Sequence, residues 1–397
     1  MSFFGNGNGG AKPPIATELK MEGAVEAPNP KKGAKELKTE PTYPKTHAEK
    51  VKALVDLSKV MDAEFKVTGS LIRLGDRSGV PVPSVSTSLP SMDYWALGCG
   101  GVPEGRIIEI FGPESAGKTT ITLDWIAQFQ KAGRLAAFVD AEHALDPQWA
   151  ALNGVDVDSL FISQPDYGEQ ALQIVERLID SHAVGIIVVD SVTALVPKAE
   201  LEGEIGDQNI GLQARMMSQA MRILVAKVAK SKVTLVFINQ IRDKIGVMFG
   251  NPETTTGGKA LKFFASQRID VRKTKMIGEG GNVKEFKGGD TSVPIGNVLK
   301  IKVVKNKVAA PFRETELHLL YETGIDRIGD MVTFADKVGV FTKRGSWIDV
   351  KLDGVTTELG NGAAQAKANL KASKDLQAIL SAAIYNVTNP PKEDKAA

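Results

Sequence analysis

The chain has 397 residues, of which 43% are hydrophobic and 24% are charged, and its formal net charge is +2. This composition is typical of a globular protein of two or three units, and no apolar run approaches the ~20 residues that span a bilayer, which argues against a membrane protein. The lone cysteine, Cys99, excludes an internal disulfide, and the N-terminus has no signal-peptide pattern, so we expect a cytoplasmic protein.

The first segments of the chain predict a disordered tail and then an N-terminal arm. Residues 1–44 are rich in Gly, Pro, Lys and Glu and have no periodicity. From His47 to Lys66 apolar residues recur about every 3.6 positions, which predicts an amphipathic helix, and residues 70–74 predict a short strand. Periodicity favours a helix packed on its own core, although this arm, residues 45–75, can also belong to the surface of a partner chain.

Residues 76–323 predict an α/β core, because apolar strand candidates alternate with helical patterns. The clearest candidates are Leu135–Val139, Leu160–Ser163, Ile186–Asp190 and Val233–Asn239. Such alternation is typical of a mainly parallel central sheet, which binds ligands beyond the carboxyl ends of its strands.

The last third of the chain has a different pattern. Residues 278–296 are glycine-rich and polar and predict a flexible connection. Helical segments and a hairpin around 347–352 predict a small α+β domain over residues 324–388, and residues 389–397 a loose tail.

The segment 112–119 carries the strongest chemical signal, because its spacing G-x-x-x-x-G-K-T is that of a loop that cradles nucleotide phosphates. A β-rich run, Arg106–Phe111, precedes it and a helical pattern, Thr120–Lys131, follows it, which is the context that the motif requires. Lys118 is expected on the terminal phosphates and the Thr119 hydroxyl on Mg²⁺. The predicted cradle comprises Gly112, Pro113, Glu114, Ser115, Ala116, Gly117, Lys118, Thr119 and Thr120.

Polar residues at three further strand ends predict the rest of a hydrolytic site. Asp190 ends a buried apolar strand and is the candidate Walker B carboxylate for Mg²⁺, although an Asp there can also be an ordinary turn residue. Glu142 follows another strand and can deprotonate an attacking water. Gln240 follows a third and can contact the terminal phosphate.

A predicted loop at residues 241–258 follows Gln240 directly. Its glycines, hydroxyls and the cations Arg242 and Lys244 suit a phosphodiester chain, and Met248 and Phe249 can stack on bases. On composition alone, a generic lid is an equally good interpretation.

Five segments together resemble the bacterial RecA recombinase family, and the similarity runs from about residue 47 to 385. They are 112–120, 140–147, 188–192, 211–222 and 238–258. The resemblance implies a RecA-like P-loop ATPase core, an N-terminal helix–strand polymerisation arm and a small α+β C-terminal domain. It also implies a DNA-dependent ATPase that uses ATP and Mg²⁺, forms a helical homo-oligomeric filament on single-stranded DNA, and exchanges strands with double-stranded DNA in recombination and repair. A LexA-type repressor and loading mediators are further implied partners.

The same resemblance assigns roles to residues. It implies catalytic roles for Glu142, Lys118, Gln240, Lys305 and Lys307, of which the last two would reach the ATP of a neighbouring subunit. Asp190 and Thr119 would serve Mg²⁺, and Asp146 and Trp149 match positions that contact adenine. The positions that match DNA contacts are Ile210, Ser218, Arg222, Arg242, Lys244, Phe249, Glu253, Thr254, Thr255, Gly257 and Gly258. Residues 202–210 resemble the family's first DNA loop and residues 241–258 its second DNA loop.

The chain departs from the family pattern at several places. Trp149 stands where a tyrosine is usual, Asp243 adds a negative charge inside the second DNA loop, and residues 391–397 lack the usual acidic tail. Three rival functions share the phosphate loop: a ring-forming helicase motor, a DNA-coating protein that binds ATP only structurally, and a small-molecule kinase. The arm at 47–74 and the loop after Gln240 disfavour the helicase motor. Glu142 discriminates the DNA-coating protein, which would not hydrolyse ATP, and a kinase would need no long basic loop after Gln240.

Overall fold

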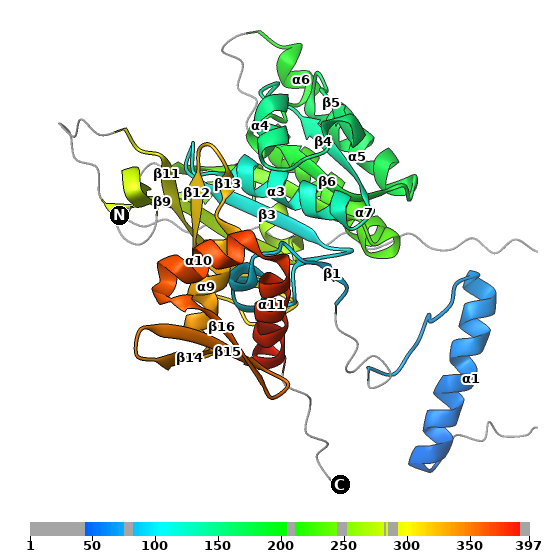
Figure 1. Ribbon diagram of the computed structural model, residues 1–397. Helices are drawn as coiled ribbons and strands as arrows, with labels where there is room; N and C mark the ends of the chain where they lie inside the picture. The colour runs from blue at the N-terminus through cyan, green and yellow to red at the C-terminus, as the bar shows by residue number, and fades with distance from the viewer. Residues whose placement is uncertain are drawn as a thin grey trace, which may run out of the picture. The chain divides into compact units, whose positions relative to one another are not determined.

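The computed structural model describes residues 44–74, 82–204, 211–243, 252–281, 283–284 and 293–389. They fall into two compact units, one before and one after residues 75–81 (Figure 1). Within the described part of the chain, we find no helix that is both long enough and apolar enough to cross a membrane.

Helix α1 (His47–Phe65) forms the first unit, as the sequence predicts. It begins with a capping box, in which Thr46 Oγ1 accepts from the Glu49 N–H at 3.2 Å and the Glu49 carboxylate accepts from the Thr46 N–H at 3.0 Å. No residue of α1 is buried, and Leu54 and Val60 are 54% and 61% exposed. Such an open apolar face is typical of a surface that meets another protein.

The strand predicted at residues 70–74 is wrong. The chain instead turns back along α1, where the Ser70 N–H donates to the Asp62 carboxylate at 2.7 Å and Ser58 Oγ donates to the Leu71 carbonyl at 2.7 Å. A strand needs a neighbouring strand to pair its backbone groups. The described residues of this unit offer a helix and no strand, so the segment satisfies part of its hydrogen bonding through helix side chains.

The second unit is built on a sheet that has 11 strands among the described residues. Along the sheet the main strands are β13 (Gly324–Ile325), β12 (Glu314–Leu320), β11 (Gly296–Asn306), β9 (Gln267–Ile277), β3 (Ile107–Gly112), β7 (Thr234–Asp243), β6 (Val184–Asp190), β4 (Leu135–Asp140) and β5 (Leu160–Ser163). The four strands predicted from the sequence are confirmed as β4, β5, β6 and β7. From β9 to β5 every neighbouring pair is parallel, as expected.

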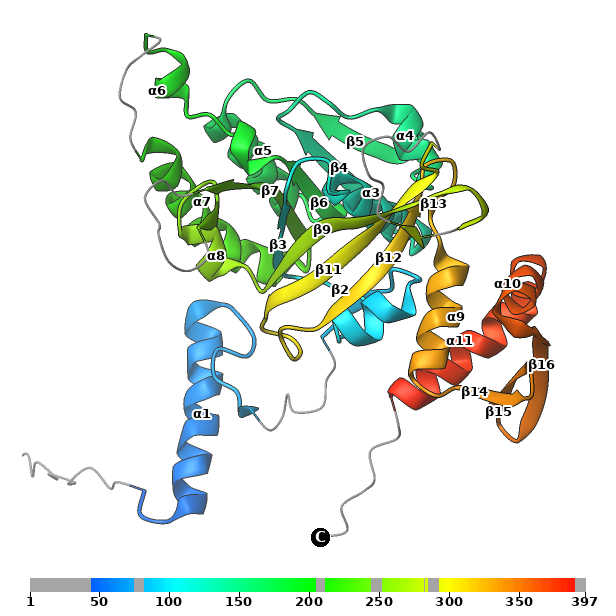
Figure 2. The same cartoon turned by 90° about the vertical axis from the view of Figure 1, so that its left-hand side faces the viewer.

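Beyond β9 the sheet continues with antiparallel pairs of β9, β11, β12 and β13, which the sequence did not predict (Figure 2). The strands β11 and β12 are joined by a short connection, and a short connection returns the chain in the opposite direction. This extension matters for function because it brings β11 and β12 toward the phosphate loop.

Helices cover both faces of the parallel strands (Figures 1 and 2). On one face, α3 (Lys118–Lys131) buries Trp125 and Phe129 against Phe138 of β4. On the other, α5 (Gly168–Asp180) and α7 (Leu212–Ser231) pack Val175 and Met221 on the sheet. The shorter helices are α4 (Pro147–Leu152), α6 (Lys198–Leu201) and α8 (Ala260–Phe264). Apolar strands covered on both faces explain why the sequence runs are continuous rather than alternating.

Two segments predicted as irregular are partly strand. The chain after Gln240 continues β7 to Asp243 and returns as β8 (Glu253–Thr255), with Ile241 opposite Thr255 in an antiparallel ladder. Likewise β10 (Val283–Lys284) pairs with β9 inside the predicted connection 278–296. Backbone groups beside an existing strand gain partners by pairing, which overrides a polar, glycine-rich composition. Residues 244–251, 282 and 285–292 lie outside the described residues.

The C-terminal region has its own core. Helices α9 (Arg327–Lys337), α10 (Gly362–Ala372) and α11 (Lys374–Thr388) pack on an antiparallel sheet of β14 (Phe341–Arg344), β15 (Trp347–Leu352) and β16 (Val355–Asn361). The predicted hairpin is thus confirmed and gains a third strand.

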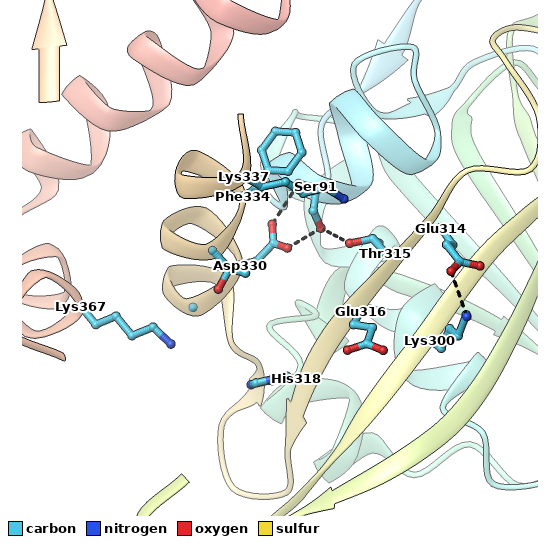
Figure 3. Close-up of a pocket in the computed structure, with 12 residues that line it drawn as sticks. Ser91, Lys300, Glu314, Thr315, Glu316, His318, Asp330, Phe334, Lys337 and Lys367 are labelled. Atoms are coloured by element: carbon cyan, nitrogen blue, oxygen red, sulfur yellow. Dashed lines mark hydrogen bonds and ion pairs between the residues drawn. The ribbon is translucent and has the colours of Figure 1, made fainter. Parts of the chain in front are cut away.

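Buried carboxylates join this region to the segments that pack around the large sheet. Asp330 of α9 accepts from the Ser91 N–H at 3.1 Å and from the Ser91 hydroxyl, and Arg327 pairs with the buried Asp124 of α3. A cavity of about 370 Å³ opens beside Asp330, with Lys367, His318 and Glu316 around it (Figure 3).

Candidate functional site

The phosphate loop lies between β3 and α3, and its backbone allows only glycine at key positions. A Cβ at Gly112 would lie 2.1 Å from the Val271 carbonyl oxygen, and Gly117, the residue that precedes α3, has φ +86°. Lys118 is buried, with Nζ donating to the carbonyls of Gly112 and Pro113 at 3.2 and 2.7 Å. Burial lowers the pKa of the Lys118 ammonium, against the pull of Asp190 and Glu142. A phosphate chain on this loop would meet a desolvated cation and a helix N-terminus.

The hydroxyl of Thr119 contacts the carboxylate of Asp190 beside the phosphate loop. Thr119 Oγ1 donates to Asp190 Oδ2 at 2.7 Å, and Asp190 ends β6 in a buried position. Burial raises the pKa of Asp190 to about 6, and the negative charge of Glu142 adds to the rise. Oxygen ligands of this kind are those that Mg²⁺ prefers, and a divalent cation would restore the charged form of the carboxylate. The donor set therefore fits the predicted magnesium.

Glu142 joins the ends of three parallel strands. It follows β4 and accepts a hydrogen bond from the hydroxyl of Ser191, which follows β6. Gln240, on β7, donates from Nε2 to the same oxygen, Oε1, at 3.2 Å. The predicted base and the predicted phosphate sensor are thus in direct contact. Two donors fix the carboxylate plane, which a general base requires.

A cavity of about 240 Å³ adjoins the loop. The indole Nε1 of Trp149 donates to Thr120 Oγ1 at 3.3 Å, which holds the aromatic ring at the wall. The opposite wall comprises Asn297, Leu299 and Leu319, from β11 and β12. Asp146 caps α4 by accepting from the Gln148 N–H at 2.8 Å. The aromatic ring of Trp149 and the apolar side chains of Leu299 and Leu319 beside the phosphate loop suit a nucleotide base and sugar.

Lys305 and Lys307 are held elsewhere. Lys305 lies at the end of β11 and Lys307 directly after it, and both donate to carbonyls at the end of α8. Lys305 donates to those of Lys262 and Phe263 at 2.6 and 2.9 Å, and Lys307 to that of Phe263 at 3.2 Å. Burial lowers the pKa of Lys305, and Lys307 and Arg268 reinforce the effect. The residues that line the cavity beside the phosphate loop are others, so these lysines do not join their own subunit's site.

The predicted DNA contacts have different surroundings. On α7, Arg222 is exposed and Ser218 half-buried, and Arg242 is exposed at the end of β7. On β8 the side chains turn to the protein: both carboxylate oxygens of Glu253 accept from Arg272, at 2.8 and 2.6 Å.

The two threonines that follow Glu253 also face the protein. Thr254 Oγ1 accepts from Lys262 Nζ at 2.8 Å, and Thr255 is buried. The buried Gly257 and the half-buried Gly258 follow them. We call residues 253–258 the returning leg of the loop. Ile210, Lys244 and Phe249 lie outside the described residues. Pairing of β8 with β7 explains why Glu253, Thr254 and Thr255 face the protein.

The sequence pattern that defines the RecA N-terminal domain matches residues 52–326, which is more than half of the chain. The chain belongs to the RecA family. Protein RecA of Chloroherpeton thalassium is 52% identical over 332 residues, which cover 84% of this chain and 88% of that one. The chromosomal RecA of Lactococcus lactis is 51% identical over 329 residues, 83% of this chain and 82% of that one. A crystal structure of the RadB recombinase matches 61% of this chain and 98% of that chain, with a TM-score of 0.46 and 18% identity.

Membership of the RecA family makes this chain a DNA-dependent ATPase with a recombinase role in DNA recombination and repair. Family membership does not by itself identify every side chain that lines the nucleotide site. Ser191, Asn297 and Leu319 were missed by sequence reasoning. Ser191 stands directly after the Walker B candidate, which could have signalled its place. Asn297 and Leu319 carry no motif, because only the fold brings their strands beside the phosphate loop.

Proposed function

We propose that the protein binds ATP and Mg²⁺ at the boundary between subunits of a helical filament on single-stranded DNA, pairs that strand with a homologous duplex, and exchanges strands. The contact between Gln240 and Glu142 carries the proposal, because Gln240 lies on the strand that continues into the second DNA loop. A change at the terminal phosphate would therefore reach the DNA-binding segment through one strand. We propose a cytoplasmic location for this activity.

In the proposed reaction, the backbone of residues 112–117 and the Lys118 ammonium bind the phosphates, and Thr119 with Asp190 would hold Mg²⁺. The cation supplies neutralisation of the charge that builds up on the transferred phosphoryl group. Glu142 orients the attacking water and takes its proton. Ser191 and Gln240 support it by fixing Oε1, so that Oε2 can receive the proton.

Assembly completes this site. We propose that Lys305 and Lys307 of one subunit contact the terminal phosphates bound by the next, since they lie at and just beyond the end of β11 and do not line the cavity beside their own phosphate loop. The exposed apolar face of α1 would be covered by a second copy of the chain. A LexA-type repressor and loading mediators are proposed as further partners on the resemblance alone.

The decisive experiment measures ATP hydrolysis with and without single-stranded DNA, followed by strand exchange between homologous substrates. We expect stimulation of hydrolysis and formation of joint molecules. Negligible hydrolysis under both conditions would favour a DNA-coating protein, and closed rings in electron micrographs would favour a helicase motor. A Gln240→Ala variant should lose the ATP-dependent gain in DNA affinity, and a variant that keeps it would contradict the proposed coupling.

A further inference from the structure

A single buried amide lies between the nucleotide site and the returning leg of the second DNA loop. Asn239, on β7, is fully buried, and its Nδ2 donates to Glu109 Oε1 at 2.9 Å and to the Thr256 carbonyl at 3.1 Å. Its Oδ1 accepts from the Gln240 N–H at 2.9 Å. Both donor hydrogens and the acceptor are therefore used. Asn239 holds the backbone of the phosphate sensor with one end and the DNA loop with the other.

Glu109 keeps this amide in register. It lies on β3, is fully buried, and its second oxygen accepts from Arg268 Nε at 2.5 Å. The Arg268 guanidinium also lies 4.5 Å from the ring centre of Phe111, which is next to Gly112 of the phosphate loop. A buried charge paired on both oxygens is costly to move, so Glu109 provides a rigid anchor.

The returning leg is also packed on the turn that follows Asp190. This turn, η3 (Val192–Ala194), contacts the leg through Thr193 Oγ1, which donates to Thr256 Oγ1 at 3.4 Å. It also leaves no space for a side chain at Gly257, where a Cβ would lie 2.8 Å from Val192 Cγ1. Thr256 thus receives contacts from the ends of two strands of the nucleotide site, β6 and β7. The leg is therefore closely packed on η3 at Gly257.

We propose that Asn239 is a positioning residue that transmits the state of the nucleotide site to the DNA loop through the Thr256 carbonyl. Displacement of Gln240 or of the end of β6 moves Thr256 directly, in addition to any movement along β7. This inference rests on the proposed function, because it requires nucleotide-dependent binding of DNA.

The test exchanges the two polar groups of the buried pair. Asn239→Asp alone would place a carboxylate against Glu109 and the Thr256 carbonyl, which are both acceptors, and should lower the melting temperature. The double change Glu109→Gln with Asn239→Asp keeps the total charge and shape. The new amide at 109 can donate to the new carboxylate at 239, and its carbonyl oxygen can still accept from Arg268 Nε, while the negative charge moves from residue 109 to residue 239. The double change repairs the core contact and leaves the contact with Thr256 broken. Its melting temperature should therefore recover toward that of the native protein.

The readout is the coupling ratio, defined as the Kd for fluorescein-labelled oligo(dT) without nucleotide divided by the Kd with ATPγS. Because one buried hydrogen bond is replaced by repulsion between two acceptors, we expect the double variant to reduce this ratio at least about fivefold, with its nucleotide-free Kd unchanged. Asn369→Asp is the matched control. It makes the same change against the Leu359 carbonyl, 2.8 Å away in the C-terminal region, and should leave the ratio at the native value.

Thr193→Val gives an independent variant if the exchanged pair does not fold, because it removes the hydroxyl contact with Thr256 and keeps the shape. It should also lower the coupling ratio. If the double variant folds and its coupling ratio equals the native value, the proposed transmission through Thr256 is overturned and the proposed function still stands. If the double variant does not fold, a native coupling ratio in Thr193→Val has the same meaning. Equal DNA affinity of the native protein with and without ATPγS overturns both.

Discussion

Asp330 provides a sharp test of how the C-terminal region is joined to the core, through the substitution Asp330→Asn. Its carboxylate is buried in α9 and accepts from Ser91, whose hydroxyl accepts in turn from Thr315 Oγ1 at 2.8 Å (Figure 3). Burial raises the pKa of Asp330 from 3.8 to about 6, and the nearby Asp326 adds to the rise. The folded protein therefore holds this proton more tightly than the unfolded chain does.

The difference in pKa between the folded and unfolded states sets the direction in which stability changes with pH. A raised carboxyl pKa makes the folded state bind more protons than the unfolded state between pH 4 and pH 6, so stability falls as the pH rises through this window. With pKa values of 3.8 and about 6, the cost of the charge to folding is about 1.6 kcal/mol at pH 5 and about 3 kcal/mol at pH 7. The asparagine variant does not titrate. Its stability relative to the native protein should therefore rise by about 1.3 kcal/mol from pH 5 to pH 7.

Urea unfolding followed by circular dichroism at the two pH values measures this quantity. Only the change with pH is used, because the difference in stability between asparagine and the protonated form of Asp330 is the same at both pH values and cancels. Asp336→Asn, at a carboxylate that is 55% exposed on the same helix, is the matched control and should show almost no change. If Asp330→Asn gives the same stability difference at pH 5 and pH 7, the inference of a buried, proton-binding joint is refuted.

Three further changes test the nucleotide site. Glu142→Gln should lower DNA-stimulated ATP hydrolysis by about 10²- to 10⁴-fold and preserve ATP binding, and equal losses in both would contradict a role as general base. Trp149→Ala should raise the KM for ATP about tenfold, because the ring at the cavity wall is lost, and Trp149→Phe should restore most of the affinity. Gly112→Ala would place a methyl group 2.1 Å from the Val271 carbonyl, so it should abolish binding of a fluorescent ATP analogue. A variant that binds normally would show that the loop relaxes.

The sequence alone determined the features that depend on neighbouring residues. The phosphate loop is a run of consecutive residues with fixed spacing, so its glycines, Lys118 and Thr119 could be assigned directly. The strand ends that carry Asp190, Glu142 and Gln240 were equally readable, because each follows an apolar run, and parallel strands present their carboxyl ends at one edge. Helix α1 was predicted from its period.

Tertiary structure alone decided which distant groups meet. The antiparallel extension of the sheet brings Asn297 and Leu319 to the phosphate loop, and the pairing of β8 with β7 turns Glu253 toward Arg272 rather than outward. The segment after α1 formed no strand for the converse reason, since the residues described in its unit include no strand with which it could pair. Local periodicity records which face of an element is apolar. It carries no information on strand register or on which buried donor finds which acceptor, because those depend on groups that are far apart in the chain and adjacent only after folding.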